Sequence, residues 1–226
     1  MVIFIFDLGI GNLSSVQFGF ERCGESSVLI ASGTDWSEQL AVWGLPQAVI
    51  LPGVGAFGDA MFQLKARGLL TPLRKAARSG VPLLGICLGM QLLFATSEES
   101  SGSVGLHLLE GNILRLPSGF KVPHMGWNSL ERMRPHPLVE GLDEGEYVYF
   151  VHSFYAEVPN PKTVVSVTPY AGVEVPAIVA EGNLCGTQFH PEKSGPIGHR
   201  ILQNFVYWSR GIHERMREEG NDVLQL

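Results

Sequence analysis

The sequence has 226 residues, of which 45% are hydrophobic and 17% are charged, and its formal net charge is −6. This length is enough to bury a sizeable core in one large domain or two small ones, and the composition is that of an ordinary globular protein. Because the charge is negative and no run of Lys or Arg occurs, we expect neither nucleic acid nor an anionic membrane as a partner.

The first residues and the cysteines give an expectation for the compartment. The apolar start of the chain, residues 1–6, is too short for a secretory leader and lacks a basic segment and a cleavage site. No apolar run is long enough to cross a bilayer. The three cysteines are an odd number without a Cys-x-x-Cys pair, so neither a disulfide framework nor a zinc site is expected. We therefore expect a cytoplasmic protein without a metal or another cofactor.

The chain begins with a β-branched and aromatic strand at residues 2–6, followed by a glycine-rich turn at 7–12. Asn12 or Ser14 is placed to cap the helix that follows. A glycine-rich turn after a first strand is also typical of dinucleotide binding. However, Ser14 stands where the third glycine belongs, and residues 27–32 contain no acidic side chain for a ribose, so we reject that interpretation.

Strands and helices then alternate as far as the middle of the chain. Further strands are predicted at 28–31, 47–51 and 81–86, and helices at 56–62 and 69–78. Such alternation implies a parallel sheet with helices on both faces, whose sites lie at the carboxyl ends of its strands. We therefore predict an α/β fold with a mixed, largely parallel open sheet flanked by helices.

The pattern changes after a polar, acidic loop at 97–105. Shorter strands follow, and Glu181-Gly182-Asn183 is a good hairpin turn between the last two. We expect an additional small antiparallel sheet, a single domain over 1–226, and fraying of residues 213–226. The shorter strands are predicted at 112–116, 148–154, 163–167, 177–180 and 184–189, before an amphipathic helix at 197–208.

The segment Gly85-Ile86-Cys87-Leu88-Gly89-Met90-Gln91 lies between a predicted strand and a helical run. A Gly-x-Cys-x-Gly sequence at such a junction is the cysteine version of the nucleophile elbow, whose strained turn lifts the sulfur to the amino end of a helix. There the helix dipole favours the thiolate, and the backbone N–H of Leu88 is able to stabilise an oxyanion. The alternative is a buried structural cysteine in a glycine-rich turn.

A cysteine nucleophile needs a base, usually a histidine, and a group that orients the base. His190 follows the strand predicted at 184–189 and precedes Pro191 and Glu192. Proline keeps the residue before it extended, and residues i and i+2 of an extended chain point to the same side. We therefore predict that Glu192 orients His190, and that Cys87, His190 and Glu192 form a catalytic triad.

The other histidines and cysteines suit structural roles better. His152 lies in mid-strand without a neighbouring acid, so we interpret it as a hydrogen-bonded core or rim histidine rather than the base. The four remaining histidines stand in polar or helical contexts and are predicted to lie at the surface: His107, His136, His199 and His213. Cys23 and Cys185 are interpreted as small buried apolar residues.

Pro52-Gly53-Val54-Gly55 follows the strand predicted at 47–51. It fits an ordinary turn, and it equally fits a flexible segment whose backbone N–H groups supply a second oxyanion donor. The sequence leaves both interpretations open.

Taken together, residues 85–91 and His190-Pro191-Glu192 resemble the class I, triad-type glutamine amidotransferases, whose fold is flavodoxin-like. Within that family the sequence is similar to the glutaminase subunits of imidazole glycerol phosphate synthases, enzymes of histidine biosynthesis. Leu8, where an aromatic residue is expected, departs from the pattern outside the chemistry. The segments that carry this narrower resemblance are 7–13, 52–55, 123–128 and 189–194.

The resemblance implies a reaction and further site residues. Cys87 would attack the carboxamide carbon of L-glutamine, while the N–H groups of Leu88 and of Val54 or Gly53 hold the oxyanion. His190 would pass a proton to the departing amine, and water would then hydrolyse the thioester to glutamate. The substrate contacts that the family implies are Gly55, Gln91, Glu99, Ser153 and Phe154.

The family also implies a partner, because its members of this type pass ammonia to a (β/α)8-barrel cyclase. The sequence contains no barrel, so a separate cyclase chain in a heterodimer is expected. The glycines at 52–55 further suggest that the free chain is nearly inactive, with the oxyanion peptide turned away until the partner is loaded. The interface candidates are Asn12, Met125, Trp127 and Lys193, and the alternative for Met125 and Trp127 is ordinary core packing.

Two alternatives to this function stay open. Another class I amidotransferase or a γ-glutamyl hydrolase would share the triad but not the acceptor of the ammonia. A binding module without activity could keep the scaffold, but the presence of Cys87, His190 and Glu192 together argues against it.

Overall fold

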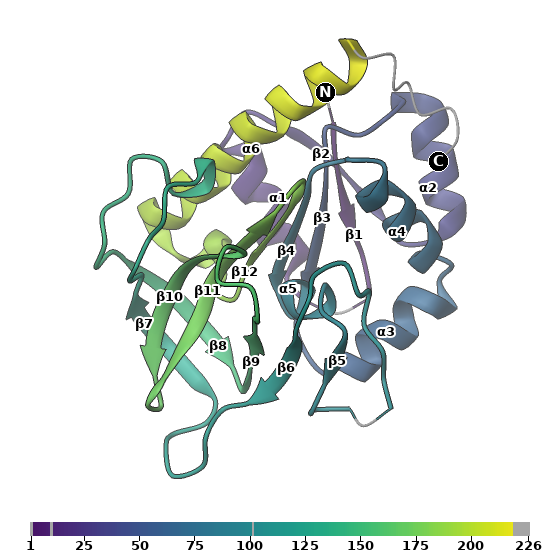
Figure 1. The fold of residues 1–226 in the computed structure, drawn as a ribbon. Helices are drawn as coiled ribbons and strands as arrows, with labels where there is room; N and C mark the ends of the chain where they lie inside the picture. The colour runs from purple at the N-terminus through teal and green to yellow at the C-terminus, as the bar shows by residue number, and fades with distance from the viewer. Residues whose placement is uncertain (1, 10, 101, 219–226) are drawn as a thin grey trace.

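The computed structural model describes residues 2–9, 11–100 and 102–218, and a seven-stranded sheet forms the centre of this part of the chain (Figure 1). Its strand order is β10-β11-β12-β4-β3-β1-β2. The strands from β12 to β2 run parallel to one another, whereas β11 is antiparallel to both of its neighbours, β12 and β10. The strands are β1 (Val2–Phe6), β2 (Ser26–Ile30), β3 (Ala48–Gly53), β4 (Leu83–Cys87), β10 (Val164–Tyr170), β11 (Val173–Glu181) and β12 (Leu184–Thr187).

Helices cover both faces of this sheet, with α1 and α6 on one face and α2, α3 and α4 on the other (Figure 1). The side chains of β1 explain why both faces are covered: Val2, Phe4 and Phe6 pack into the apolar core on one face, and Ile3 and Ile5 pack into the core on the other. A strand buried on both faces needs such a continuous apolar run. The predicted α/β fold is confirmed. The helices are α1 (Leu13–Glu21), α2 (Gly33–Trp43), α3 (Phe57–Ala66), α4 (Leu70–Arg78), α5 (Leu88–Leu92) and α6 (Gly195–Glu218).

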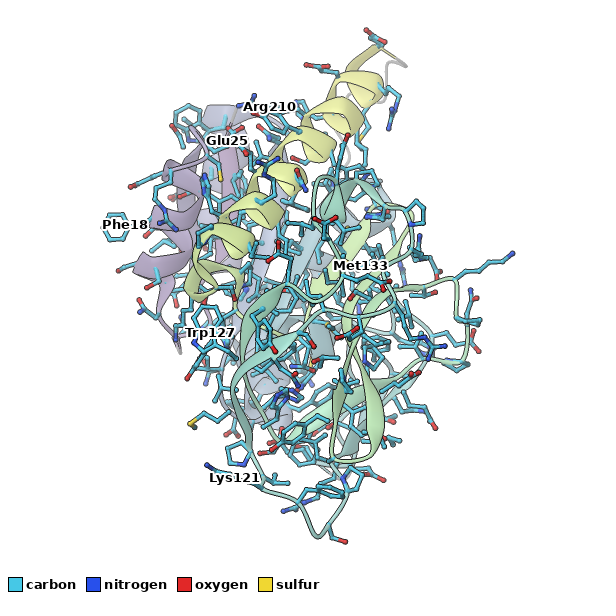
Figure 2. The ribbon with its side chains drawn as sticks, turned by 90° about the vertical axis from the view of Figure 1, so that its left-hand side faces the viewer. Phe18, Glu25, Lys121, Trp127, Met133 and Arg210 are labelled. Carbon is cyan, nitrogen blue, oxygen red and sulfur yellow. The ribbon has the colours of Figure 1, made fainter. Side chains whose placement is uncertain are left out.

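The last helix is longer than the sequence pattern predicts. It continues to Glu218, and His213 and Met216 are buried, so the fraying expected for 213–218 is wrong. Residues 219–226, the rest of that prediction, lie outside the described residues. Arg210 ties α6 to the turn before β2 through a salt bridge to the buried carboxylate of Glu25, with 2.6 Å between Nη2 and Oε1 (Figure 2).

Two small sheets stand beside the main one, where the sequence predicted one. The strand predicted at 148–154 is in fact two strands, because the chain bends at Ser153 and its halves enter different sheets. β7 (His124–Ser129) pairs with β8 (Tyr147–His152) in an antiparallel ribbon. β5 (Thr96–Ser97), β6 (Asn112–Arg115) and β9 (Phe154–Glu157) form the other sheet, in which β5 and β6 are parallel.

The sequence-based prediction lacks the strand β7, the helix α2 and the two-residue strand β5. The signals for α2 are local: the Ser32 hydroxyl accepts from the Asp35 N–H at 3.1 Å, and Gly44, at φ +71°, ends the helix. The hairpin turn predicted at 181–183 is confirmed, since β11 and β12 pair there. Among the described helices, none combines the length and the apolar character that a bilayer span requires.

Candidate active site

Three neighbouring parallel strands end side by side and supply the candidate site. In the register of the sheet, Gly53 at the end of β3 lies beside Cys87 at the end of β4. Thr187 of β12 pairs with Ile86, so the chain beyond β12 also arrives next to Cys87. Because ligands bind outside the carboxyl ends of parallel strands, this edge is where a site is expected.

Cys87 occupies the strained turn that the sequence predicts. Its φ is +54° and its ψ is −108°, a conformation that non-glycine residues rarely adopt, and α5 begins at the next residue. A Cβ on Gly89 would stand 1.6 Å from the Leu51 carbonyl oxygen, and one on Gly85 would stand 2.6 Å from the Gly89 oxygen. Both glycines are therefore required by close packing, and the elbow is confirmed as a geometry.

The predicted base and its orienting group are in contact. His190 Nδ1 lies 2.8 Å from Glu192 Oε1, and the two side chains are only 4% and 3% exposed. The backbone between the two residues differs from the prediction. His190 is extended, but Pro191–Lys193 form a 3-10 turn (η2), so the carboxylate reaches the ring by chain reversal rather than along a continuing strand.

The electrostatics of His190 favour the imidazolium. Burial by itself would lower the pKa of His190, but the Cys87 sulfur and the Glu192 carboxylate outweigh it and raise that pKa to about 10. His190 Nε2 is buried and has no partner that meets hydrogen-bond geometry, so the sulfur acts on it from a longer distance. Such loose contacts are common in unliganded sites. A protonated imidazole beside the sulfur is the environment that a cysteine nucleophile needs.

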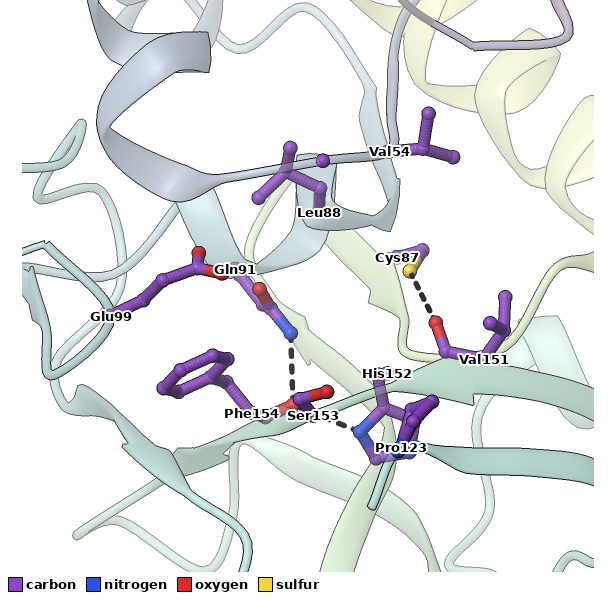
Figure 3. A pocket seen from close by; sticks show the side chains of 11 residues that line it. Val54, Cys87, Leu88, Gln91, Glu99, Pro123, Val151, His152, Ser153 and Phe154 are labelled. Atoms are coloured by element: carbon purple, nitrogen blue, oxygen red, sulfur yellow. Dashed lines mark hydrogen bonds between the residues drawn. The ribbon is translucent and has the colours of Figure 1, made fainter.

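A cavity of about 320 Å³ opens over Cys87 (Figure 3). The Cys87 sulfur lies 3.7 Å from the Val151 carbonyl oxygen at one end of this cavity. The lining contains every substrate contact implied by the resemblance and two of the three oxyanion candidates, whereas Gly53 lies beside it. The expected residues in the lining are Val54, Gly55, Cys87, Leu88, Gln91, Glu99, Ser153 and Phe154, and the residues that sequence reasoning missed are Pro123, Val151 and His152.

The side chains of Gln91 and Glu99 make hydrogen bonds within the protein that the sequence does not predict. Gln91 Nε2 donates to the Phe154 carbonyl at 2.9 Å and to Gln188 Oε1 at 3.1 Å, which leaves its own oxygen for a ligand. Glu99 Oε2 accepts from the Phe57 N–H at 2.7 Å and thereby caps α3, whose own N-cap residue, Ala56, has no capping side chain. Both residues hold the cavity in shape as well as lining it.

His152 is confirmed as a hydrogen-bonded residue at the rim of the cavity, and its exclusion as the base stays a prediction. Both of its ring nitrogens have partners, the Phe154 carbonyl and His124, each at 2.9 Å. His107 is exposed, but the surface prediction is wrong for His213, which is buried, and His136 and His199 are half-buried. Of the two other cysteines, Cys185 is buried as predicted, and burial raises the pKa of the half-buried Cys23 to about 11.

The interface candidates are at the surface. Met125 and Trp127 are 57% and 55% exposed on the outer side of β7, so core packing is excluded for both (Figure 2 shows Trp127). Lys193 is exposed, and Asn12 caps α1 by accepting from the Ser15 N–H at 3.2 Å. Asn12, Lys193 and Gly53 also line a small cavity that reaches His190 and Glu192.

The described residues contain no cluster of His, Cys, Asp or Glu suited to a metal ion. The groups at this edge that are suited to chemistry are a sulfur, a buried imidazole–carboxylate pair, and the backbone N–H groups at the start of α5. The first N–H groups of a helix lack acceptors within the helix, which makes them available to a developing negative charge.

Comparisons with known proteins give a consistent result. Residues 4–208 match the family described as glutamine amidotransferase class-I. The chain is 50% identical over 203 residues to the imidazole glycerol phosphate synthase subunit HisH of Moorella thermoacetica, covering 90% of this chain and 93% of the relative. The HisH subunit of Geobacillus kaustophilus is 47% identical over 211 residues, which cover 91% and 96%.

Solved structures agree at the level of the fold. A crystal structure of a glutamine amidotransferase superposes with a TM-score of 0.71 at 20% identity, covering 92% of this chain and 99% of that one. PurLQS from Thermotoga maritima superposes with a TM-score of 0.67 at 21% identity, covering 94% and 98%.

Proposed function

The chain belongs to the class I glutamine amidotransferase family, and from this premise we propose that Cys87, His190 and Glu192 hydrolyse L-glutamine to glutamate and ammonia. The protein is the glutaminase subunit of an imidazole glycerol phosphate synthase and acts in histidine biosynthesis. The observation that carries the assignment of residues is the meeting of a strained cysteine elbow with a buried His190–Glu192 pair at adjacent strand ends.

The first half of the reaction forms a thioester. In the resting ion pair the thiol proton has already passed from Cys87 to His190, and the Cys87 thiolate attacks the carboxamide carbon of glutamine, whose oxygen becomes an oxyanion. The N–H of Leu88 and an N–H from Gly53 or Val54 hold that oxyanion. His190 then gives its proton to the nitrogen as the C–N bond breaks, which releases ammonia and leaves a γ-glutamyl thioester. Glu192 keeps the proton of Nδ1 in place, so that Nε2 faces the reaction.

The second half regenerates the enzyme. Water gives a proton to His190 Nε2 and attacks the thioester carbon, and the collapse of the second oxyanion breaks the C–S bond. Glutamate leaves and Cys87 returns as a thiolate paired with the imidazolium. The raised pKa of His190 fits this cycle, because the charged ring is stable next to sulfur and carboxylate.

The cavity gives the substrate its orientation. We place the side-chain amide at Cys87 and the amino-acid end toward Gln91, Glu99 and the bend at Ser153-Phe154, all of which line the cavity. The free oxygen of Gln91 and the carboxylate of Glu99 suit an ammonium group, which is the only strongly cationic part of glutamine. Gly55, at φ +96°, lies on the opposite wall next to Val54.

The ammonia needs a protected path, because in neutral water it would be protonated and would lose its nucleophilicity. We propose that a cyclase subunit, a (β/α)8 barrel, docks as a heterodimer on the surface that contains Met125, Trp127, Asn12 and Lys193. Exposed aromatic and methionine side chains are enriched in such interfaces. The three cysteines are not paired with one another, which supports the cytoplasm as the compartment.

One experiment tests the triad and the partner together. Glutaminase activity is measured for the wild type, Cys87→Ser and Cys185→Ser, each with and without a cyclase subunit that holds its ligand. Activity and stoichiometric labelling by a glutamine analogue with an electrophilic ketone should require Cys87 and tolerate the loss of Cys185, whose buried thiol lies away from the cavity. Absence of labelling in the complex would support a module without activity. Equal rates with and without the loaded partner would refute the proposed resting state of residues 52–55.

A further inference from the structure

A pair of buried histidines stands beside the cavity and has no part in the mechanism above. His152 ends β8, lines the cavity, and pairs in register with His124, the first residue of β7. His124 Nδ1 lies 2.9 Å from His152 Nε2, and His152 Nδ1 lies 2.9 Å from the Phe154 carbonyl oxygen (Figure 3 shows the second contact). At the far end, His124 Nε2 is 3.4 Å from Asn128 Nδ2.

These contacts permit only one arrangement of protons. A carbonyl oxygen only accepts, so His152 Nδ1 carries the proton that bonds to Phe154. In a neutral ring Nε2 is then an acceptor, and His124 Nδ1 must donate to it. That leaves His124 Nε2 as an acceptor, and it faces an amide NH2 of Asn128, which is a donor. Three separate contacts therefore agree on one direction, from β7 toward the cavity.

The surroundings hold both rings in place. His124 is stacked between Phe150 and Tyr170, with ring centroids 4.7 Å and 3.8 Å away and interplanar angles of 18° and 17°. Burial lowers the pKa of His124 to about 4 and that of His152 to about 3, so both rings are neutral at pH 7. Because both rings stay neutral, each keeps its tautomer, and the hydrogen bonds keep their donor-to-acceptor direction from His124 to the Phe154 carbonyl.

The chain of bonds ends on the wall of the cavity. The Phe154 carbonyl accepts from His152 Nδ1 and from Gln91 Nε2, each at 2.9 Å. The preceding carbonyl, that of Ser153, accepts from the Leu116 N–H at 3.0 Å. With both carbonyls occupied, the peptide groups of the bend between β8 and β9 are fixed in rotation, and this bend is the part of the wall against which we place the substrate.

We propose that His124 and His152 are positioning residues, forming a one-directional hydrogen-bond chain that fixes the Ser153-Phe154 wall for glutamine and ties it to β7. This inference rests on the proposed function. The same strand presents Met125 and Trp127 on its outer side, so the chain links the proposed docking surface to the substrate wall through one residue of β7.

The test uses steady-state glutaminase kinetics of the complex with the cyclase subunit. His124→Phe keeps a flat ring between Phe150 and Tyr170 but removes the donor, which leaves His152 Nε2 unpaired. The KM for glutamine should rise about tenfold, with kcat within about twofold of the wild type. His124→Asn, whose amide reaches the place of Nδ1, should recover most of the loss. Tyr170→Phe, which touches the same ring outside the chain of bonds, is the control and should leave KM unchanged.

A double-mutant cycle identifies the route. His152→Asn keeps a donor for the Phe154 carbonyl but separates it from His124, so His124→Phe should change KM less than twofold in that background. An unchanged KM in His124→Phe, or the same rise in both backgrounds, would overturn the inference. A wild-type complex without glutaminase activity would instead refute the proposed function.

A measurement on the unaltered protein covers the case in which a variant does not fold. Nitrogen-15 NMR of the imidazole rings in the full chain should show both His124 and His152 as the neutral tautomer protonated at Nδ1. A proton on Nε2 of either ring would reverse the direction of the chain and overturn the proposal.

Discussion

Replacing Glu192 by Gln tests the buried pair at the centre of the mechanism. The change keeps the shape of the side chain and removes the charge that His190 Nδ1 faces at 2.8 Å. A hydrogen bond to a charged group contributes about 1.5–3 kcal/mol. If that stabilisation acts on the imidazolium in the transition state, kcat/KM should fall between about 10-fold and about 150-fold. If the amide introduced at position 192 turns its NH2 toward His190 Nδ1, the ring is held in the tautomer protonated at Nε2. The loss in kcat/KM should then be near the upper end of this range.

The free energy of unfolding should also change with pH in a defined direction. The pKa of His190 is raised from its ordinary value of 6.5 to about 10. The stability that the charged ring contributes is therefore fully present below pH 6.5 and is lost as the pH rises through about 10. Glu192→Gln should bring the pKa of His190 down, so the fall in the free energy of unfolding between pH 7 and pH 10 should be smaller than in the wild type.

The assay combines glutaminase kinetics of the cyclase complex with NMR titration of His190 and denaturant unfolding at several pH values. Glu174→Gln is the matched control, because it also removes a carboxylate charge, from an exposed ion pair with Arg132. It should leave activity and pH profile unchanged. A Glu192→Gln enzyme with activity within threefold of the wild type and an unshifted His190 pKa would refute the reasoning.

Three further predictions follow from individual residues. Cys87→Ser should lower glutaminase activity at least about a thousandfold, while its urea unfolding stays close to that of the wild type. A rate near the wild-type value would contradict the role of Cys87 as the nucleophile. Gly89→Ala drives a Cβ against the Leu51 carbonyl and should destabilise the fold by about 3 kcal/mol or more in urea unfolding; an unchanged midpoint would show that α5 moves freely. Trp127→Ala should weaken cyclase binding at least about tenfold in calorimetry, with unfolding free energy unchanged within about 0.5 kcal/mol. Equal affinity would place the interface elsewhere.

The features that the sequence predicts well are local ones. The elbow is encoded by Gly85, Cys87 and Gly89 within one turn, and its conformation depends on close approach that those glycines alone permit. His190 and Glu192 meet for a similar reason, since two intervening peptide bonds keep them within reach. Even here the detail escaped prediction, because Pro191 starts a 3-10 turn instead of continuing the strand.

The features that the sequence does not predict depend on contacts between distant segments. Glu99 caps α3 from a loop that lies far along the chain, and no sequence motif predicts such a contact. His124 and His152 come together only because β7 pairs with β8, and β7 itself was missed. The apolar pattern needed to recognise β7 is misleading, since Met125 and Trp127 face outward instead of into a core.

The place of β12 in the sheet has a consequence for biosynthesis. The proposed nucleophile, Cys87, lies in the first half of the chain, whereas its proposed acid–base partner, His190, follows β12, which inserts between β4 and β11. If the proposed mechanism holds, a copy still leaving the ribosome, or one cleaved before β12, has the cysteine without its base and should not hydrolyse glutamine. Splitting the chain in the turn at Gly182-Asn183 should give two inert pieces, with hydrolysis returning only after they reassociate.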